Sequence, residues 1–231
     1  LQIVKYLSVN QELNYLCGRE TKHMSFHLFN TLTAYGDQYA LKRHVKLNDV
    51  LSKLNNYKNS WTPYNPRKKI NRWGLSLTNL DGKLGPGPDL DSLREYNAEH
   101  NTKIREKDFI VPTPVYDIFS DVLAPISQWL IRCHVLQLRP GGYFPAHIDN
   151  YGSDIESFRL LIPLENMNPD HSWFMIEDRI LHWKHGDIYF LNTCKQHTLF
   201  NAGFKNMTMV VLNVLLEKEV VDYILSSKVM Y

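Results

Sequence analysis

The sequence predicts a mainly β fold with flanking helices, an α+β arrangement in which roughly eight strands form a jelly roll. Six short runs rich in Leu, aromatic and β-branched residues lie between residues 131 and 215. Turn signals separate these runs, for example the Arg-Pro-Gly-Gly sequence at residues 139–142. Aromatic residues make up 12% of the chain, which suits strands that surround a lined cavity. Short strands at this spacing are typical of a sandwich or a barrel.

The spacing of apolar residues places the individual elements. Helical spacing predicts helices near residues 45–54 and 115–123, and in the C-terminal tail from residue 218. A short helix is expected near residues 90–97. The expected strands are residues 73–77, 131–138, 158–164, 172–176, 180–183, 187–191 and 207–215.

A break near residue 60 divides the chain. Pro63 and Pro66 enforce extended or turn geometry there, whereas the residues before them contain no proline. We therefore predict that residues 1–60 form an N-terminal helical or mixed extension. Residues 61–231 then form the jelly-roll domain.

Composition and charge exclude several classes of protein. The net charge is +2, so nothing in the overall charge indicates nucleic-acid binding. The three cysteines are widely spaced and odd in number, which favours a reducing, cytoplasmic setting over a disulfide framework. The longest apolar run, residues 209–216, is too short to span a membrane. The first eleven residues lack a basic leader and a continuous apolar segment, so no signal peptide is expected.

Three residues form a candidate metal site. His147 and Asp149 are two positions apart, and in a strand such residues point to the same face. His197 follows forty-eight positions after Asp149, an interval with room for about four strands. Two histidines and one carboxylate on one face of a metal make the facial triad of non-haem Fe(II) oxygenases. The triad leaves three positions open for a co-substrate and O₂.

Arg159 is the next candidate, because it stands in an apolar strand. A buried arginine is costly unless it is paired, and a dicarboxylate co-substrate would supply a bidentate partner. The alternative is an outward-facing Arg159, with Phe158, Leu160 and Ile162 facing the core.

The chain resembles the aspartyl/asparaginyl β-hydroxylase-like branch of the 2-oxoglutarate/Fe(II) oxygenases, in particular its bacterial and viral members. The matching segments cover about residues 61–216: NRWGLSLTNLDGKLGPGPDLDSLREYN (71–97), LRPGGYFPAHID (138–149), FRLLIPL (158–164), HWKHGDIYFLNTCKQHTLFN (182–201) and MVVLNVLL (209–216). The resemblance implies a double-stranded β-helix, the cupin-like form of the jelly roll. It also implies Fe(II), 2-oxoglutarate and O₂ as cofactor and co-substrates, with His147, Asp149 and His197 as metal ligands.

The resemblance implies a dioxygenase that hydroxylates an unactivated C–H bond of an amino acid or of a peptide residue such as Asp, Asn or Pro. 2-Oxoglutarate would be converted to succinate and CO₂. Arg159 corresponds to a basic residue that contacts the co-substrate in the family. The family often carries a second arginine about ten residues after the distal histidine, where this chain has Met207. Lys205 is a possible substitute for it.

The sequence is also compatible with other functions. A cupin-type metalloenzyme could use zinc or manganese on the same architecture, and a non-catalytic binding module could retain the fold. A small-molecule or peptide substrate is favoured over nucleic acid, and no membrane association or oligomeric state is indicated. A second metal site at His182 and His185 is conceivable. The basic run at residues 67–72 is expected to be a solvated loop.

Overall fold

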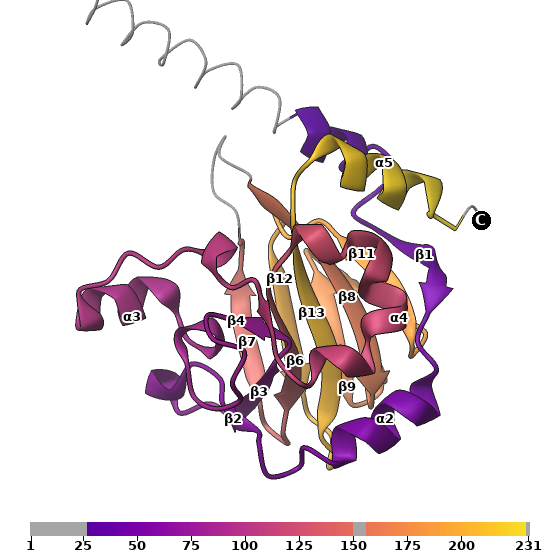
Figure 1. Cartoon of the computed structure of the whole chain (residues 1–231). Coiled ribbons are helices and arrows are strands. Elements are labelled where there is room, and N and C mark those ends of the chain that lie inside the picture. Colours follow the sequence, from indigo (N-terminus) through magenta and orange to yellow (C-terminus); the bar gives the residue numbers. More distant parts are fainter. Residues whose placement is uncertain (1–26, 150–155, 230–231) are drawn as a thin grey trace, which may run out of the picture.

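The computed structural model describes residues 27–149 and 156–229, and Figure 1 traces their course. Eight consecutive strands form its centre, and they alternate between two antiparallel sheets. These strands are β6 (Leu130–Leu138), β7 (Tyr143–His147), β8 (Ser157–Glu165), β9 (Ser172–Ile176), β10 (Arg179–Ile180), β11 (Asp187–Leu191), β12 (His197–Asn201) and β13 (Met207–Leu215).

The order of the strands identifies the architecture. In the larger sheet the neighbours run β11-β8-β13-β6, and the smaller sheet has the order β10-β9-β12-β7. Consecutive strands therefore cross from one sheet to the other, except for the β9–β10 hairpin. This is a double-stranded β-helix of eight strands, so the predicted jelly roll and its mainly β class are confirmed.

Three further strands widen the larger sheet to seven. They are β1 (Gln38–His44), which pairs with β11, β3 (Arg72–Ser76), which pairs with β6, and β2 (Thr62–Pro63), which pairs with β3. The strands β4 (Thr78–Asn79) and β5 (Val111–Pro112) form a separate pair. Because β1 lies in the main sheet, the described part of the expected N-terminal extension, residues 27–60, shares the sheet and the core of the jelly roll.

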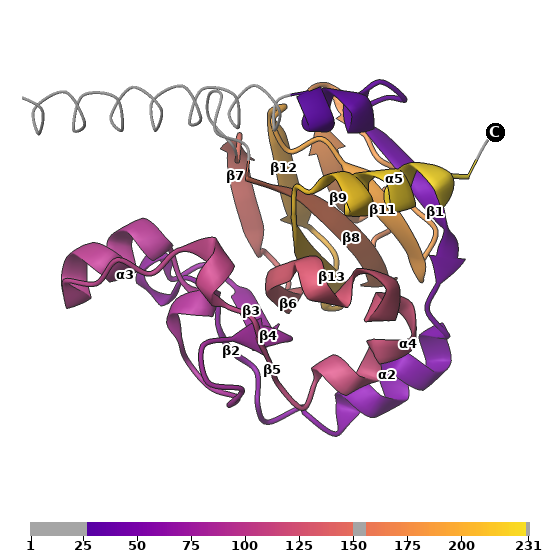
Figure 2. The same cartoon turned by 45° about the horizontal axis from the view of Figure 1, so that its top comes forward.

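Helices cover the outer face of the larger sheet (Figure 2). The α-helices are α2 (Leu47–Asn55), α3 (Leu93–His100), α4 (Ser120–Leu123) and α5 (Lys218–Ser226), and residues 27–33 are also helical. Short 3-10 turns occupy Pro66–Lys68, Pro88–Leu90, Glu106–Asp108, Tyr116–Ile118 and Ala124–Trp129. Val50 of α2, Leu123 of α4 and Ile224 of α5 pack with sheet residues such as Phe158 and Leu212 in one apolar core. Within the described part of the chain, no helix combines the length and the apolar character that a membrane span requires.

A second core fills the space between the two sheets. It joins Leu136, Leu161 and Met209 of the larger sheet to Phe174 and Leu199 of the smaller one. The larger sheet is therefore buried on both faces, and the sequences of its long strands β6, β8 and β13 are almost continuously apolar. Strands β9 and β12 of the smaller sheet instead alternate between buried and half-buried residues.

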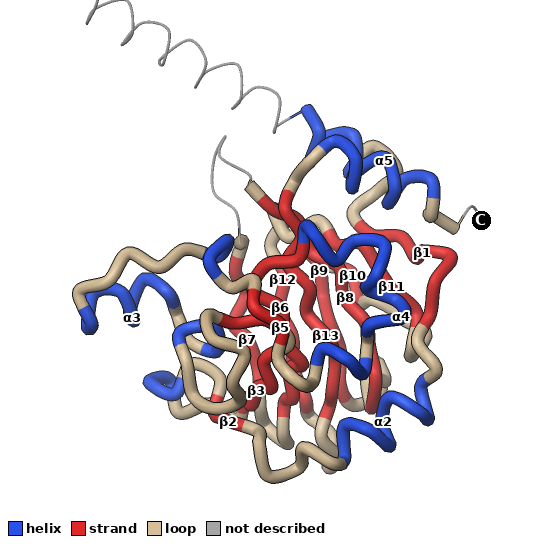
Figure 3. The backbone as a smooth tube through the Cα atoms, viewed as in Figure 1, coloured by secondary structure: helices blue, strands red, loops and turns tan. Residues whose placement is uncertain are grey.

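The predicted elements agree with this structure at most positions (Figure 3). The expected strands match β3, β6, β8, β9, β11 and β13, and the expected helices match α2, α3 and the start of the tail as α5. Two predictions were too long. The strand expected at residues 180–183 is only the two-residue β10, and the helix expected at 115–123 is a 3-10 turn followed by the four-residue α4. The expectation of no signal peptide concerns residues 1–11, which lie outside the described residues.

Candidate metal centre

His147 and His197 meet across two neighbouring strands of the smaller sheet. His147 ends β7, His197 begins β12, and the two residues are register partners in this antiparallel pair. Their ring centroids are 4.3 Å apart. The four strands β8 to β11 lie between the two residues in sequence, as the spacing predicted.

Asp149 completes the group from outside the strand. The sequence predicted that His147 and Asp149 share one strand face, but β7 ends at His147 and Asp149 lies in a bend. The backbone N–H of Asp149 donates to the carbonyl oxygen of Thr193, at 3.0 Å, in the loop before β12. This bond, rather than strand periodicity, turns the carboxylate toward the two histidines.

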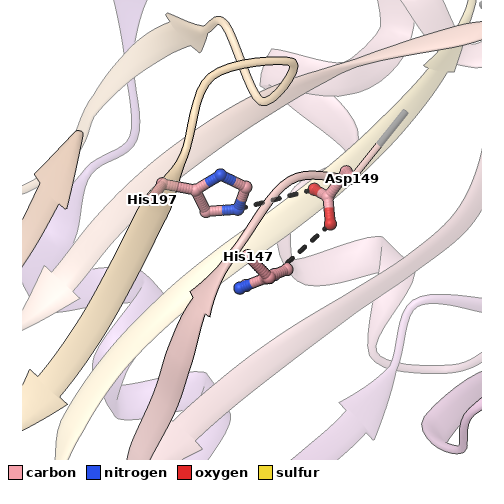
Figure 4. A group of neighbouring side chains, drawn as sticks. All are labelled: His147, Asp149 and His197. Atoms are coloured by element: carbon pink, nitrogen blue, oxygen red, sulfur yellow. Dashed lines mark ion pairs between the residues drawn. The ribbon is translucent and has the colours of Figure 1, made fainter. Parts of the chain in front are cut away.

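The three side chains converge on one point (Figure 4). His147 Nε2 lies 3.3 Å from Asp149 Oδ1, and His197 Nε2 lies 3.6 Å from Asp149 Oδ2. One ligand atom from each residue lies within 4.8 Å of the others, a spacing that could hold a metal ion. His197 is 4% exposed, whereas His147 and Asp149 are half-buried, so the group is open on one side.

The hydrogen bonds of the histidines prepare them for metal binding. His147 Nδ1 lies 2.7 Å from the carbonyl oxygen of Pro145, and His197 Nδ1 lies 2.9 Å from that of Lys195. A carbonyl oxygen only accepts, so each Nδ1 must carry the proton and donate it. Nε2, which faces Asp149, is then the nitrogen of each ring that would coordinate a metal ion.

Arg159 of β8 also reaches this group. Its Nη1 lies 2.6 Å from Asp149 Oδ2, and its Nε donates to Asn213 Oδ1 at 3.1 Å. Burial opposes ionisation of Asp149, but Arg159 and the two histidines outweigh burial and hold the pKa of Asp149 well below its usual range. The carboxylate is therefore charged at neutral pH, as a metal ligand must be.

Asp149 also affects the protonation of the histidines. The hydrogen bond to Asp149 raises the pKa of His147. Burial lowers the pKa of His197, which favours its neutral form.

The outward-facing alternative for Arg159 is wrong, although the three apolar neighbours named with it do face a core. Phe158, Leu160 and Ile162 face the helix-covered core, while Arg159 and Leu161 face the other sheet. The Arg159 side chain is 30% exposed, because it lies at the open side of the space between the two sheets. Arg159 thus points inward, toward Asp149.

Two adjoining pockets reach the candidate metal centre. The inner one has an apolar floor with a few polar groups, and its lining includes Leu136, Phe174, Met209, His134 and Thr193. The outer one is a cleft with a volume of about 420 Å³. His147, Asp149, Arg159, Arg72 and Phe144 all line it. This volume lies in the range of roughly 300–1,000 Å³ that is common for small-molecule sites.

The other predicted site residues lie elsewhere. Lys205 is exposed in the loop after β12, at the end of that strand opposite to His197, and it lines neither pocket. Met207 is fully buried in the core between the sheets. His182 is exposed, and His185 Nε2 accepts from the backbone N–H of Met167 at 3.2 Å. In the described ranges, only His147, Asp149 and His197 form a three-residue group that could hold a metal.

The sequence did not identify Arg72 or His134 as site residues. Arg72 belongs to the basic run that was expected to be a solvated loop, but it is the first residue of β3 and is 4% exposed. His134 of β6 is also 4% exposed, and its Nδ1 has no hydrogen-bond partner among the described residues. Burial, followed by the charges of Arg132 and Arg159, lowers the pKa of His134, so this histidine is neutral. A polar side chain inside an apolar strand was the available signal for His134, whereas Arg72 stood outside the expected strand and gave no such signal.

No protein-family model matches the sequence, and no curated protein matches it. Among solved structures, a prolyl hydroxylase from Trichoplax adhaerens, in complex with a hypoxia inducible factor peptide fragment, is 14% identical with a TM-score of 0.48. The match covers 87% of this chain and 93% of that one. The viral collagen prolyl hydroxylase of Paramecium Bursaria Chlorella virus-1 is 10% identical with a TM-score of 0.43, over 79% and 97% of the chains. A prolyl-4-hydroxylase from Pseudomonas putida is 14% identical with a TM-score of 0.42, over 77% and 90%.

Proposed function

We propose that this chain is an Fe(II)- and 2-oxoglutarate-dependent dioxygenase that hydroxylates an unactivated C–H bond of an amino acid or peptide residue. The observation that carries this proposal is the convergence of His147, Asp149 and His197 at ligand distances, with both Nε2 atoms turned toward the carboxylate. Two imidazoles and one carboxylate are the ligand set of non-haem Fe(II) oxygenases, and they leave adjacent positions for a co-substrate and O₂.

The protein supports this chemistry through its own residues. The Pro145 and Lys195 carbonyl groups fix the ring orientation of the two histidines. Arg159 keeps Asp149 ionised and lies beside it, where it can also contact the carboxylate of a co-substrate. When bound, the iron would activate O₂, the oxidant of the reaction: one oxygen atom would enter succinate as 2-oxoglutarate loses CO₂, and the other would become the hydroxyl group of the product.

The apolar floor has a separate role. Leu136, Leu161, Met209 and Val211 surround the inner pocket and limit the access of water to it. Exclusion of water protects reactive species from side reactions. A cleft of this size at the metal suits a small molecule or a side chain on a peptide.

The test is succinate formation from 2-oxoglutarate with Fe(II). The wild-type protein is expected to form succinate, coupled to a substrate or uncoupled, and Asp149→Ala is expected to lose this activity. Asp170→Ala is the matched control, because Asp170 is an exposed aspartate that is absent from both pockets. Its succinate formation should equal that of the wild type.

The same assay separates this proposal from a cupin-type enzyme that uses another metal. Zinc with three protein ligands also fits the group, so metal content alone does not decide. Wild-type protein that neither turns over nor binds 2-oxoglutarate in the presence of metal would contradict the proposal. If turnover is found, free Asp, Asn and Pro and peptides that contain them are the first substrates to screen.

A further inference from the structure

Arg72 is a buried cation in the outer cleft. It begins β3 and is 4% exposed, and its guanidinium lies over the Phe144 ring, 4.2 Å from the ring centroid. Phe144 also lines the inner pocket, next to His147. Arg72 and Phe144 line the outer cleft together with the metal-ligand candidates His147 and Asp149. The contact with the Phe144 ring thus holds the Arg72 guanidinium in the same cleft that a molecule bound to the metal would occupy.

Arg72 has no charged partner within the described part of the chain. It takes part in no ion pair and no side-chain hydrogen bond there, and its Nε is buried without an acceptor. Burial lowers the pKa of Arg72 from its ordinary value, which expresses the cost of the desolvated charge. A buried guanidinium without a partner destabilises the fold, and an anion bound in the cleft would offset this cost.

The other cations that line the cleft are already paired. Arg132 donates to Glu106 Oε1 at 2.5 Å and to the carbonyl oxygens of Asp89 and Asp91. Lys68 lies 3.1 Å from Glu95. Arg159 is paired with Asp149. Among the described lining residues of the outer cleft, Arg72 is therefore the cation that lacks a counter-charge.

The register of the sheet relates Arg72 to Met207. Met207 of β13 pairs with Leu138 of β6, and Leu138 pairs in turn with Arg72 of β3. Directly paired residues project to the same face of a sheet, so the three form one row on the inner face. The resemblance places a co-substrate arginine at the position of Met207. This chain carries its arginine in the same row, two strands away.

We propose that Arg72 binds the far carboxylate of the keto-acid co-substrate in the metal cleft. This inference rests on the proposed function and adds the residue that anchors the co-substrate. Lys205 is remote and Met207 is apolar, and Arg159 is engaged beside the metal ligands. Arg72 contributes both the charge and the two-pronged geometry that a carboxylate requires.

The test compares two keto acids that differ in the far carboxylate alone. Binding of 2-oxoglutarate and of 2-oxopentanoate to the Mn(II)-loaded protein is measured by calorimetry for the wild type and for Arg72→Met. Loss of one partner of a buried charge pair should weaken 2-oxoglutarate binding at least about 30-fold. The affinity for 2-oxopentanoate, which lacks the far carboxylate, should change by less than about twofold because it makes no such pair.

Arg139→Gln is the matched control. Arg139 also lies over an aromatic ring, that of Trp73, with 3.7 Å to the centroid, but it lines neither pocket. Its loss should leave both affinities unchanged. Equal weakening of both keto acids by Arg72→Met, or no weakening of either, would overturn the assignment of Arg72. Wild-type protein that binds neither keto acid would instead contradict the proposed function itself.

Thermal unfolding supplies a readout that does not depend on activity. Met fills a similar volume without a charge, so ligand-free Arg72→Met should melt at or above the wild-type temperature. Mn(II) with 2-oxoglutarate should raise the melting temperature of the wild type more than that of the variant. A ligand-free variant that melts below the wild type would assign Arg72 a structural role and would overturn the proposal.

Discussion

The two sheets of the jelly roll differ in how deeply they are packed and in which of them carries the candidate histidine ligands. The larger sheet is buried on both faces, and its longest strands, β6, β8 and β13, have nine residues each. In the smaller sheet β7, β9 and β12 have five residues each and β10 has two, and β7 at its edge has no fully buried residue. Yet β7 and β12 of this smaller sheet carry both histidines of the candidate metal centre. Extensive packing is therefore concentrated in the sheet that lacks the two histidines, and the histidines lie where the site must open to solvent.

The largest effect should come from the smaller sheet and should concern activity. His147→Ala removes a ligand whose side chain is 32% exposed. Metal affinity and turnover should fall by more than about 100-fold. Loss of a group that only orients a ligand typically lowers them by about 10- to 100-fold, and loss of the ligand itself should cost more. Stability of the metal-free protein should change little, because few core contacts are lost. Metal titration and urea unfolding measure the two quantities.

His171→Ala is the control for this change, because His171 is an exposed histidine remote from the pocket lining. Its metal affinity should equal that of the wild type. A His147→Ala protein that binds metal normally would remove His147 from the centre.

The next effect should come from the larger sheet and should concern stability. Phe158 is fully buried and packs near Phe190, with 6.2 Å between ring centroids. Phe158→Ala should lower the free energy of unfolding by about 3–5 kcal/mol, because it leaves a cavity. Metal affinity measured under folding conditions should stay within about twofold if the two sheets act separately. A parallel loss of metal affinity would show that the division is wrong.

A smaller effect should appear in the pH dependence of the metal-free protein. The folded-state pKa of Asp149 lies below its ordinary value, so its ionised form favours the folded state. This stabilisation is present above about pH 4, the ordinary pKa of an aspartate, and is lost as pH falls further. Urea unfolding from about pH 5 to about pH 3 should show a steeper loss for the wild type than for Asp149→Asn. Equal slopes would contradict the charge pairing of Asp149.

The smallest effect should lie on the outer face of the smaller sheet. Trp173 and Phe200 are cross-strand partners with 5.3 Å between ring centroids. A double-mutant cycle with alanine at both positions should give a coupling energy of about 0.5–1.5 kcal/mol. Metal affinity should be unaffected, because these rings are absent from the lining of both pockets. A larger coupling would mean that this face contributes more to stability than its exposure indicates.

The sequence predicted the strands well where the pattern was local. Long apolar runs such as β6, β8 and β13 and the turns between them are visible without knowledge of pairing. The place of β1 was not predictable, because its partner β11 lies about 150 residues later and only long-range pairing joins them. For the same reason, the break at Pro63 suggested two parts although the strands on both sides of it join one sheet.

The candidate site shows the same limit. The three candidate ligands were recognisable through the turns and strands around them and through the family resemblance, even though Asp149 lies beyond the strand that was expected to carry it. Arg72 was not recognisable, because a sheet that is buried on both faces lacks the alternation that reveals where a side chain points. The row shared by Arg72 and Met207 exists only through pairing with β6.

The position of β7 at the sheet edge has one further consequence. This strand pairs only with β12, and Pro145 at its centre has no backbone N–H to donate. A metal ion held by His147 and His197 would join the ends of these two strands as a cross-link. Release of the ion would then be coupled to fraying of the edge. Amide hydrogen exchange in β7 and β12 should therefore report metal occupancy, and it should slow when the metal is bound.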